Sequence, residues 1–176
     1  DNLFSRLCRV IGVVRKCRSI LSVNIKLMIY HALFRSHINY CHLVWGTTSS
    51  NLNKILLRKK RILRIIADVR YLYHTKPLLE KFSIIAITNL HVYRLLCAFF
   101  FGTNEFIEFL WRTSDLNKKE ISISMRCSEI WYVPHFRTNH ALQSLRHMLP
   151  SLLNTYHLEN IDICSLTRAE LYMCFI

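Results

Sequence analysis

Five basic side chains follow one face of an expected helix at residues 54–66, and clustered cations of this kind bind phosphates. At about 100° per residue, one arc of that helix carries Lys54, Arg58, Lys60, Arg61 and Arg64. The opposite arc is apolar and carries Leu52, Ile55, Leu56, Ile62, Leu63 and Ile66. Lys59 projects near the apolar arc, and we expect its long stem to carry the ammonium group outward. The helix can therefore pack on a protein core through one face and present cations to a polyanion through the other.

The charge around this helix favours a binding role over a merely solvated face. Solvated helix faces usually mix Glu with Lys, whereas this helix holds no acid before Asp68. Residues 1–76 hold 15 basic and 2 acidic residues and so carry the whole net charge of +13, because residues 77–176 hold 9 of each. Arg15 and Lys16 extend the same basic character to an earlier helix. A phosphate backbone is the partner that such a surface favours, with an anionic membrane as the competing partner.

The sequence lacks the common motifs of catalysis, and although it contains both Cys and His, it recommends no particular Cys-His pair as a nucleophile. Two-metal polymerase or nuclease chemistry needs clustered carboxylates, and the 11 acidic residues include no Asp-Asp pair. Glycines stand only at positions 12, 46 and 102, so no Gly-rich phosphate-binding loop is possible. The seven cysteines form no Cys-x-x-Cys pair and are expected to be buried reduced thiols, and His135, His140 and His147 lack the i, i+4 spacing of helical metal ligands. We expect no catalytic residue, no metal and no cofactor, and no enzymatic activity from this chain by itself.

The elements that position these residues are predicted to be mainly helices. Hydrophobic residues make up 52% of the chain, and only three Gly and three Pro occur. Apolar periodicity predicts helices over 2–18, from a Ser22 cap onward, from Ser49 or Ser50 to 66, and from a Thr88 cap, with shorter ones at 75–81 and 102–111. Tyr40 and Trp45 are expected in the core. No apolar run reaches 18 residues, so we predict no transmembrane helix, and no signal-peptide pattern begins the sequence.

The helical pattern weakens from about Thr113. Residues 121–124 alternate like a strand, residues 133–139 are typical of extended chain, residues 144–154 indicate a helix interrupted by Pro150, and residues 167–175 indicate a last short helix. We therefore predict a small basic helical bundle over residues 1–112, followed by a less regular C-terminal segment over residues 113–176 with short helices and short extended segments.

Five segments, in this order, resemble the reverse transcriptases of non-LTR retrotransposons, in particular the jockey-like group. Residues 30–46 (YHALFRSHINYCHLVWG) are similar to a family helix that closes with Asn-Tyr and Trp-Gly. Residues 57–66 (LRKKRILRII) resemble its Leu-Gln-Lys-Lys-Ala-Ile-Arg-Ile-Ile helix, and residues 74–84 (HTKPLLEKFSI) its His-Thr-x-Pro-Leu step. Residues 133–139 (VPHFRTN) and 149–154 (LPSLLN) resemble the Arg-Thr-Asn and Leu-Pro-x-Leu-Trp-Asn marks that end such reading frames.

This resemblance implies that the chain is a fragment of a reverse transcriptase, an RNA-directed DNA polymerase. The endonuclease and the palm with its paired aspartates would lie upstream, and the bundle would be the thumb-like region that grips the RNA/DNA template–primer duplex. No small-molecule substrate is implied, and the location would be intracellular, and nuclear as part of the full-length protein. His140 stands where the family commonly has Gly, which puts the local turn in doubt because histidine disfavours positive φ.

The residues expected to contact nucleic acid are of two kinds. The helix cations and their neighbours would bind phosphates without reading sequence; they are Lys54, Arg58, Lys60, Arg61, Arg64, Arg15 and Lys16. Arg137 and Asn139 lie in an extended segment and could touch nucleic acid or serve a structural turn. The alternative function is a non-enzymatic basic helical module that binds an acidic membrane surface or a protein partner, although the apolar arc lacks the Trp and Phe that interfacial helices often carry.

Overall fold

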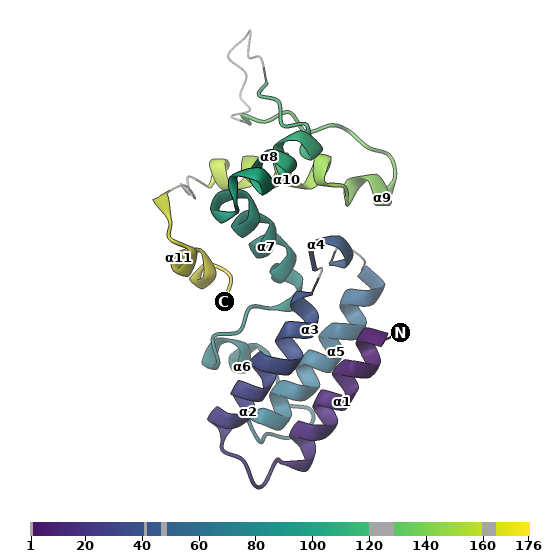
Figure 1. The fold of residues 1–176 in the computed structure, drawn as a ribbon, viewed down its shortest axis with the longest axis vertical. Helices are drawn as coiled ribbons and strands as arrows, with labels where there is room; N and C mark the ends of the chain where they lie inside the picture. Colours follow the sequence, from purple (N-terminus) through teal and green to yellow (C-terminus); the bar gives the residue numbers. More distant parts are fainter. Residues whose placement is uncertain (1, 41, 47–48, 120–128, 160–164) are drawn as a thin grey trace. The chain divides into compact units, whose positions relative to one another are not determined.

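The structure, a computed structural model, describes residues 2–40, 42–46, 49–119, 129–159 and 165–176, with the side chains of residues 2, 44, 45, 49 and 50 left out (Figure 1). The chain is mainly helical, as its composition predicts. The helices are, in order, α1 (Asn2–Lys16), α2 (Val23–Ile29), the π-helix η1 (Tyr30–Arg35), α3 (Ser36–Asn39), α4 (His42–Trp45), α5 (Ser49–Ile66), α6 (Lys76–Lys81), α7 (Ile87–Phe101), α8 (Asn104–Ser114), α9 (Asn139–Leu142), α10 (Leu145–Leu158) and α11 (Arg168–Met173). The expected strand at residues 121–124 lies outside the described residues.

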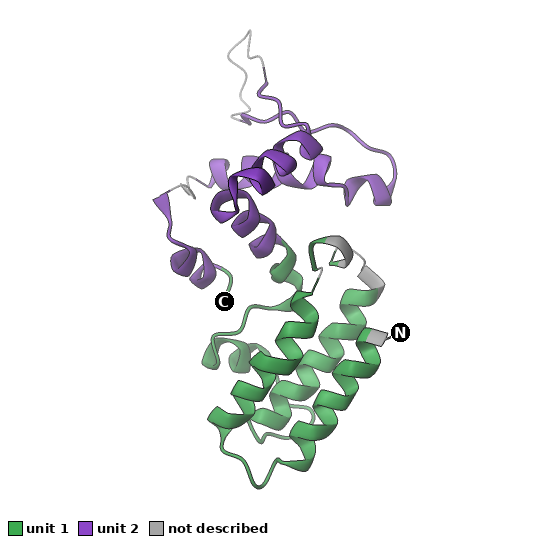
Figure 2. Cartoon of the chain, viewed as in Figure 1, with its two compact units in different colours: residues 1–91, 175–176 green, residues 92–174 purple. Residues whose placement is uncertain are grey.

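The chain divides into two compact units (Figure 2). Unit 1 comprises residues 1–91 with 175–176, and unit 2 comprises residues 92–174. The sequence placed the boundary at residues 112–113, where the helical pattern weakens. The structure places it within α7 instead, because α8 packs on α10 of unit 2. Periodicity shows where a helix ends but not which helix it packs against, and this is why the two boundaries differ.

Unit 1 is built on three helical pieces that pack side by side (Figure 1). They are α1, α5 and the continuous run α2–η1–α3. Apolar side chains on α1 and α5 form the buried seam between them: Leu7, Val10, Ile11, Val14, Ile55, Ile62, Leu63 and Ile66. Each buried side chain of this size contributes roughly 1.5–3 kcal/mol, so tertiary packing rather than helix propensity holds the basic helix in place. The amphipathic patterns predicted for residues 2–18 and 54–66 are confirmed.

The run α2–η1–α3 begins at the predicted cap and departs from prediction at its end. The Ser22 hydroxyl accepts a hydrogen bond from the Ile25 N–H at 3.5 Å. The wider π turn brings the buried rings of Tyr30 and Phe34 into a stack with centroids 5.4 Å apart. Tyr40 is 78% exposed, so its expected place in the core is wrong. The helix ends at Asn39 and the backbone at Tyr40 becomes extended, which takes its ring off the packing face.

Gly46, which follows α4, is buried against His42. A Cβ at Gly46 would lie 2.5 Å from the His42 carbonyl oxygen and 2.7 Å from the ring carbon Cε1. His42 is itself buried, and the His91 ring centroid lies 5.9 Å from its own. The position of the Trp-Gly landmark therefore requires glycine here, because any side chain at position 46 would collide with His42. The expected core position of the Trp45 side chain lies outside the described residues.

Lys59 is buried, which corrects the expectation that its ammonium group reaches solvent. The residue is 4% exposed, and its Nζ donates a hydrogen bond to the Ile85 carbonyl. Burial lowers the pKa of Lys59 from 10.5 to about 7, and the Arg35 guanidinium adds to that effect. The backbone at the buried Ile85 thus lies against this part of α5, and the ammonium group of Lys59 meets that backbone and not solvent.

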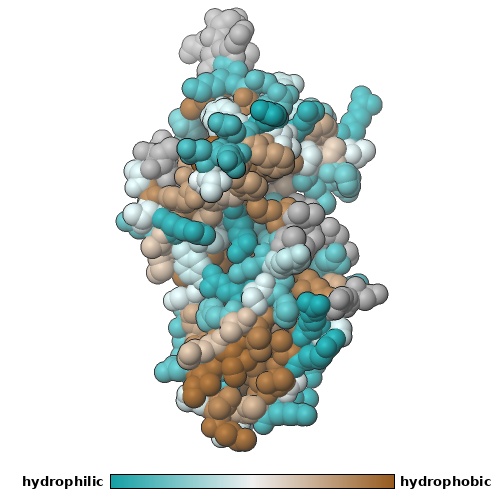
Figure 3. All heavy atoms as spheres, in the orientation of Figure 1, coloured by the Kyte–Doolittle hydropathy of each residue, from teal (hydrophilic) through white to brown (hydrophobic). Residues whose placement is uncertain are grey.

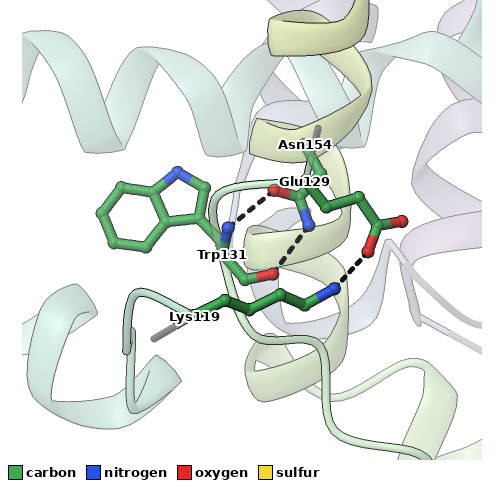
Figure 4. A network of polar contacts seen from close by, with 4 residues as sticks. All are labelled: Lys119, Glu129, Trp131 and Asn154. Carbon is green, nitrogen blue, oxygen red and sulfur yellow. Dashed lines mark hydrogen bonds and ion pairs between the residues drawn. The ribbon is translucent and has the colours of Figure 1, made fainter. Parts of the chain in front are cut away.

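In unit 2, one buried amide side chain holds an extended segment to a helix (Figure 4). Asn154 of α10 donates a hydrogen bond from Nδ2 to the Trp131 carbonyl at 2.9 Å, and its Oδ1 accepts one from the Trp131 N–H at 2.9 Å. Lys119 and Glu129 form an ion pair beside this clamp, and the Lys119 N–H donates to the Ile130 carbonyl at 2.8 Å. The extended chain predicted from Val133 therefore begins earlier and is fixed through its backbone.

Two details of unit 2 correct the sequence analysis. His140 lies inside α9, and the non-glycine residues with positive φ in the described chain are Asp68, Ser83 and Asp115, so the doubt raised by a missing glycine does not apply. The helix predicted to be interrupted at Pro150 is continuous from Leu145 to Leu158. Proline removes a single backbone donor, and the packing of the buried Leu149 and Leu153 outweighs that loss.

Candidate nucleic-acid interface

An open groove lies along the contact between α1 and α5. It encloses about 400 Å³ and is lined by Cys8, Ile11, Gly12, Arg15, Leu57, Arg58, Lys60, Arg61, Arg64 and Tyr71. A second hollow of about 220 Å³ shares Arg15, Arg61, Arg64 and Tyr71 with it and adds Arg18, Ile65 and Val69. We call the two hollows together the basic groove. Four of the five predicted α5 cations, and Arg15 from α1, thus line one continuous surface.

Arg58 is held in the groove by contacts in which no carboxylate of the described residues takes part. Its Nη1 donates a hydrogen bond to the Lys54 carbonyl at 3.0 Å, and its Nε donates to the Cys8 sulfur at 3.4 Å. The guanidinium also lies 5.1 Å from the centroid of the Phe4 ring on α1. These contacts orient the guanidinium, and none of them neutralises its charge.

Arg64 is held in the same way at the other end of α5. Its Nε donates a hydrogen bond to the Tyr73 carbonyl at 2.8 Å, and its guanidinium lies 5.6 Å from the centroid of the Tyr71 ring. Both partners come from the connector between α5 and α6. The arginine therefore fixes the position of the connector beside the groove while keeping its own charge.

No acidic side chain lines the basic groove in the part of the chain that the structure describes. Asp68, two residues after the end of α5, forms an exposed ion pair with Arg18, which lines the second hollow. Arg15, Lys60 and Arg61 form no ion pair with any described carboxylate. Like charges gathered along a groove concentrate positive potential there, so an external anion is the counter-charge that this surface favours.

The remaining predicted residues lie outside the groove. Lys54 is exposed on α5, with its Nζ 5.4 Å from the Phe4 ring centroid, and Lys16 is exposed at the end of α1. Arg137 and Asn139 are exposed in unit 2. They flank Thr138, whose Oγ1 accepts a hydrogen bond from the Ala141 N–H at 3.3 Å and caps α9. That cap gives the Arg-Thr-Asn segment a structural role.

Sequence reasoning missed Tyr71 and Cys8, both of which line the groove. The connector around Tyr71 combines basic and aromatic residues (RYLYH, residues 70–74), and that signal was available in the sequence. The expectation that the cysteines are buried is wrong for Cys8 and Cys174, which are exposed, and holds for Cys97. Cys8 is exposed because it lies on the groove side of α1, next to the buried Leu7.

Other kinds of site find no support in the described residues. No three His, Cys, Asp or Glu side chains among them gather closely enough to hold a metal ion. None of the helices in the described ranges combines the length and apolar character needed to span a bilayer. A comparison of the chain with protein-family models, with curated proteins and with solved structures finds no match in any of the three.

Proposed function

We propose that the basic groove of unit 1 binds the sugar–phosphate backbone of nucleic acid, and that the chain is the thumb-like, non-catalytic part of a non-LTR retrotransposon reverse transcriptase. One observation carries the first half: five cations line a single groove, and no acidic residue among those described lines it with them. The five are Arg15, Arg58, Lys60, Arg61 and Arg64. The ordered landmarks of residues 30–154 support the second half. In the full-length protein this region would act in the nucleus beside an upstream palm.

The arrangement of charge suits a polymer of phosphates better than a single small anion. The cations come from successive turns of α5 and from α1, so they follow the length of the groove and do not converge on one point. Arg58 and Arg64 are fixed by backbone carbonyls and rings, which orients their guanidinium groups for phosphate contact. Contacts of this kind position a nucleic acid without reading its sequence.

Gly12 offers a sharp test because it lines the groove and has room for a side chain. A Cβ built at Gly12 meets no atom within 4 Å. Gly12→Glu would place a carboxylate among the cations, and Gly12→Gln is the neutral variant of the same size. Wild-type binding to an RNA–DNA duplex should weaken steeply as salt rises. We expect Gly12→Glu to weaken binding at least about tenfold and Gly12→Gln to change it about threefold or less.

The salt dependence itself provides the second measurement. Arg15→Gln with Arg61→Gln should reduce the slope of log K against log salt by about one for each phosphate that the variant no longer neutralises. Arg9→Gln is the matched control, because Arg9 is an exposed cation of α1 that does not line the groove. A slope near zero for the wild type, or a loss of affinity from Arg9→Gln as large as that from the double variant, would refute phosphate binding by the groove.

One observation favours the alternative of an acidic membrane surface. Apolar side chains gather at the end of unit 1 formed by α2 and the turn before it, where Met28 is 69% and Ile20 is 79% exposed (Figure 3). Interfacial segments combine exposed apolar groups with nearby cations. Flotation with anionic vesicles separates the two functions: capture that withstands Gly12→Glu, together with no binding to duplex, would favour the membrane.

A further inference from the structure

Tyr71 combines exposure with a fixed position in the basic groove. It lines both hollows, yet the residue is 74% exposed. The Arg64 guanidinium lies 5.6 Å from its ring centroid, and the bond from Arg64 to the Tyr73 carbonyl anchors the connector two residues further on. A large ring held beside five cations and open to solvent buries little apolar area within the protein, so packing alone does not account for its position.

An exposed ring of this kind can stack on a nucleic-acid base only where the face of that base is free. In a duplex each base face is covered by its neighbours, whereas unpaired bases stack readily on aromatic side chains. Proteins that hold single strands combine a positively charged groove along the backbone with such rings. The basic groove and Tyr71 together have this composition, and the apolar side chains of Ile11 and Leu57 lie among the same cations.

We infer that the basic groove takes an unpaired stretch of nucleic acid, with phosphates against Arg15, Lys60 and Arg61 and one base stacked on Tyr71. This inference rests on the proposed function and adds the class of strand that the site holds. The volume agrees with it, since about 400 Å³ is within the range of sites that enclose a small organic molecule. A single nucleotide with its phosphate has the size of such a small molecule and can enter the groove. A duplex is wider and would contact only the edge of the groove.

The test compares two probes on the full chain at the same salt concentration. One is an oligothymidylate of about 12 nucleotides carrying a terminal dye, and the other is a blunt RNA–DNA duplex of about the same length. We expect Tyr71→Ala to weaken binding of the single strand at least about fivefold and to leave its salt slope unchanged, because stacking involves no phosphate. Blunt-duplex binding should stay as in the wild type.

Two further variants keep the result interpretable. Tyr71→Phe retains the ring and should bind the single strand as the wild type does. Tyr40→Ala removes a tyrosine that is equally exposed in unit 1 but does not line the groove, and should also be neutral. A 2-aminopurine placed in the single strand should be quenched by the wild type and by Tyr71→Phe, and remain bright with Tyr71→Ala.

The outcomes separate this inference from the proposed function. Wild-type single-strand affinity in Tyr71→Ala, or equal losses of affinity for both probes, would overturn the stacking role even if duplex binding keeps its steep salt dependence. Weaker capture by anionic vesicles, with unchanged oligonucleotide binding, would assign Tyr71 to a membrane instead. Failure of the wild type to bind either probe would refute both the inference and the proposed function.

Discussion

Lys59 places a titratable group in the interior of unit 1, and the stability of the chain should depend on pH because of it. Its pKa is lowered to about 7 in the folded chain, mainly by burial and further by Arg35, from 10.5 in the unfolded chain. Between these two values the unfolded chain binds a proton at Lys59 that the folded chain does not. The free energy of unfolding therefore rises as pH increases across this window, by at most about 1.4 kcal/mol per pH unit.

The variant Lys59→Met should remove this dependence. We expect the wild type to gain stability to urea from about pH 7 to about pH 9.5, a window that ends below the raised pKa values of Tyr93 and Tyr156. Lys59→Met should lose that gain and be more stable near pH 7 by on the order of 2 kcal/mol, since its folding does not have to remove a proton from a side chain that is charged in the unfolded chain.

Lys76→Met is the matched control, because Lys76 is exposed at the start of α6. Its urea midpoints should follow those of the wild type at every pH. Parallel pH profiles for the wild type and Lys59→Met would contradict the burial of an uncharged Lys59, as would a Lys59→Met variant that is less stable at neutral pH.

The clamp made by Asn154 acts at the scale of elements, because it joins α10 to the segment that contains Trp131. Asn154→Ala removes both hydrogen bonds to the Trp131 backbone and leaves a gap at a position that is 3% exposed. We expect a loss of about 2–3 kcal/mol in the free energy of unfolding. Trp131 packs edge-on against Trp111 with centroids 5.6 Å apart. Release of this segment should expose the Trp131 ring to water, so tryptophan emission should also shift to the red.

Thr155→Ala provides the comparison for this variant. Thr155 follows Asn154 on α10 and is exposed, and its hydroxyl donates a hydrogen bond to the Ser151 carbonyl of the same helix. Its removal should change the urea midpoint little and leave the emission maximum in place. Equal effects of the two substitutions would show that the clamp does not hold the extended segment.

The elements that the sequence could predict are those with a strong local signal. The apolar stripes of α1 and α5, the Ser22 cap and the short α6 with Pro77 behind Thr75 are all present. Thr88, expected as a cap, instead lies inside α7, which begins at Ile87. The pattern of polar and apolar residues in a helix fixes its existence better than its first residue.

What the sequence could not predict depends on contacts between distant residues. Lys59 is buried because Ile85 lies against it, 26 positions further on, and no periodicity in α5 carries that information. The position of Tyr71 depends on Arg64 reaching across a turn to the connector. The four groove cations of α5 were predictable because they share one helical arc, whereas their meeting with Arg15 depends on the packing of α1. The sequence could thus predict which side chains of α5 form the candidate site, but not which residues of other segments meet them there.

At the scale of the whole molecule, charge and compact units coincide. Unit 1 holds 16 basic and 3 acidic residues and so carries the net +13, while unit 2 holds 8 of each. A polyanion should therefore bind unit 1, and the exposed pair Arg137 and Asn139 of unit 2 should contribute little. Binding to one unit slows the local opening of its helices, because the bound state must release the ligand before the amides exchange.

Hydrogen exchange with and without a saturating oligonucleotide measures this division directly. We expect slower exchange in peptides from residues 3–16 and 54–75 and unchanged exchange in peptides from residues 139–158. Gly12→Glu should abolish the protection, whereas Arg137→Gln with Asn139→Ala should leave it intact. Protection confined to unit 2, or its loss in the Arg137 and Asn139 double variant, would move the interface away from the basic groove. Protection of both units that disappears only in Gly12→Glu would instead mean that binding at α1 and α5 stabilises helices beyond the unit that makes the contact.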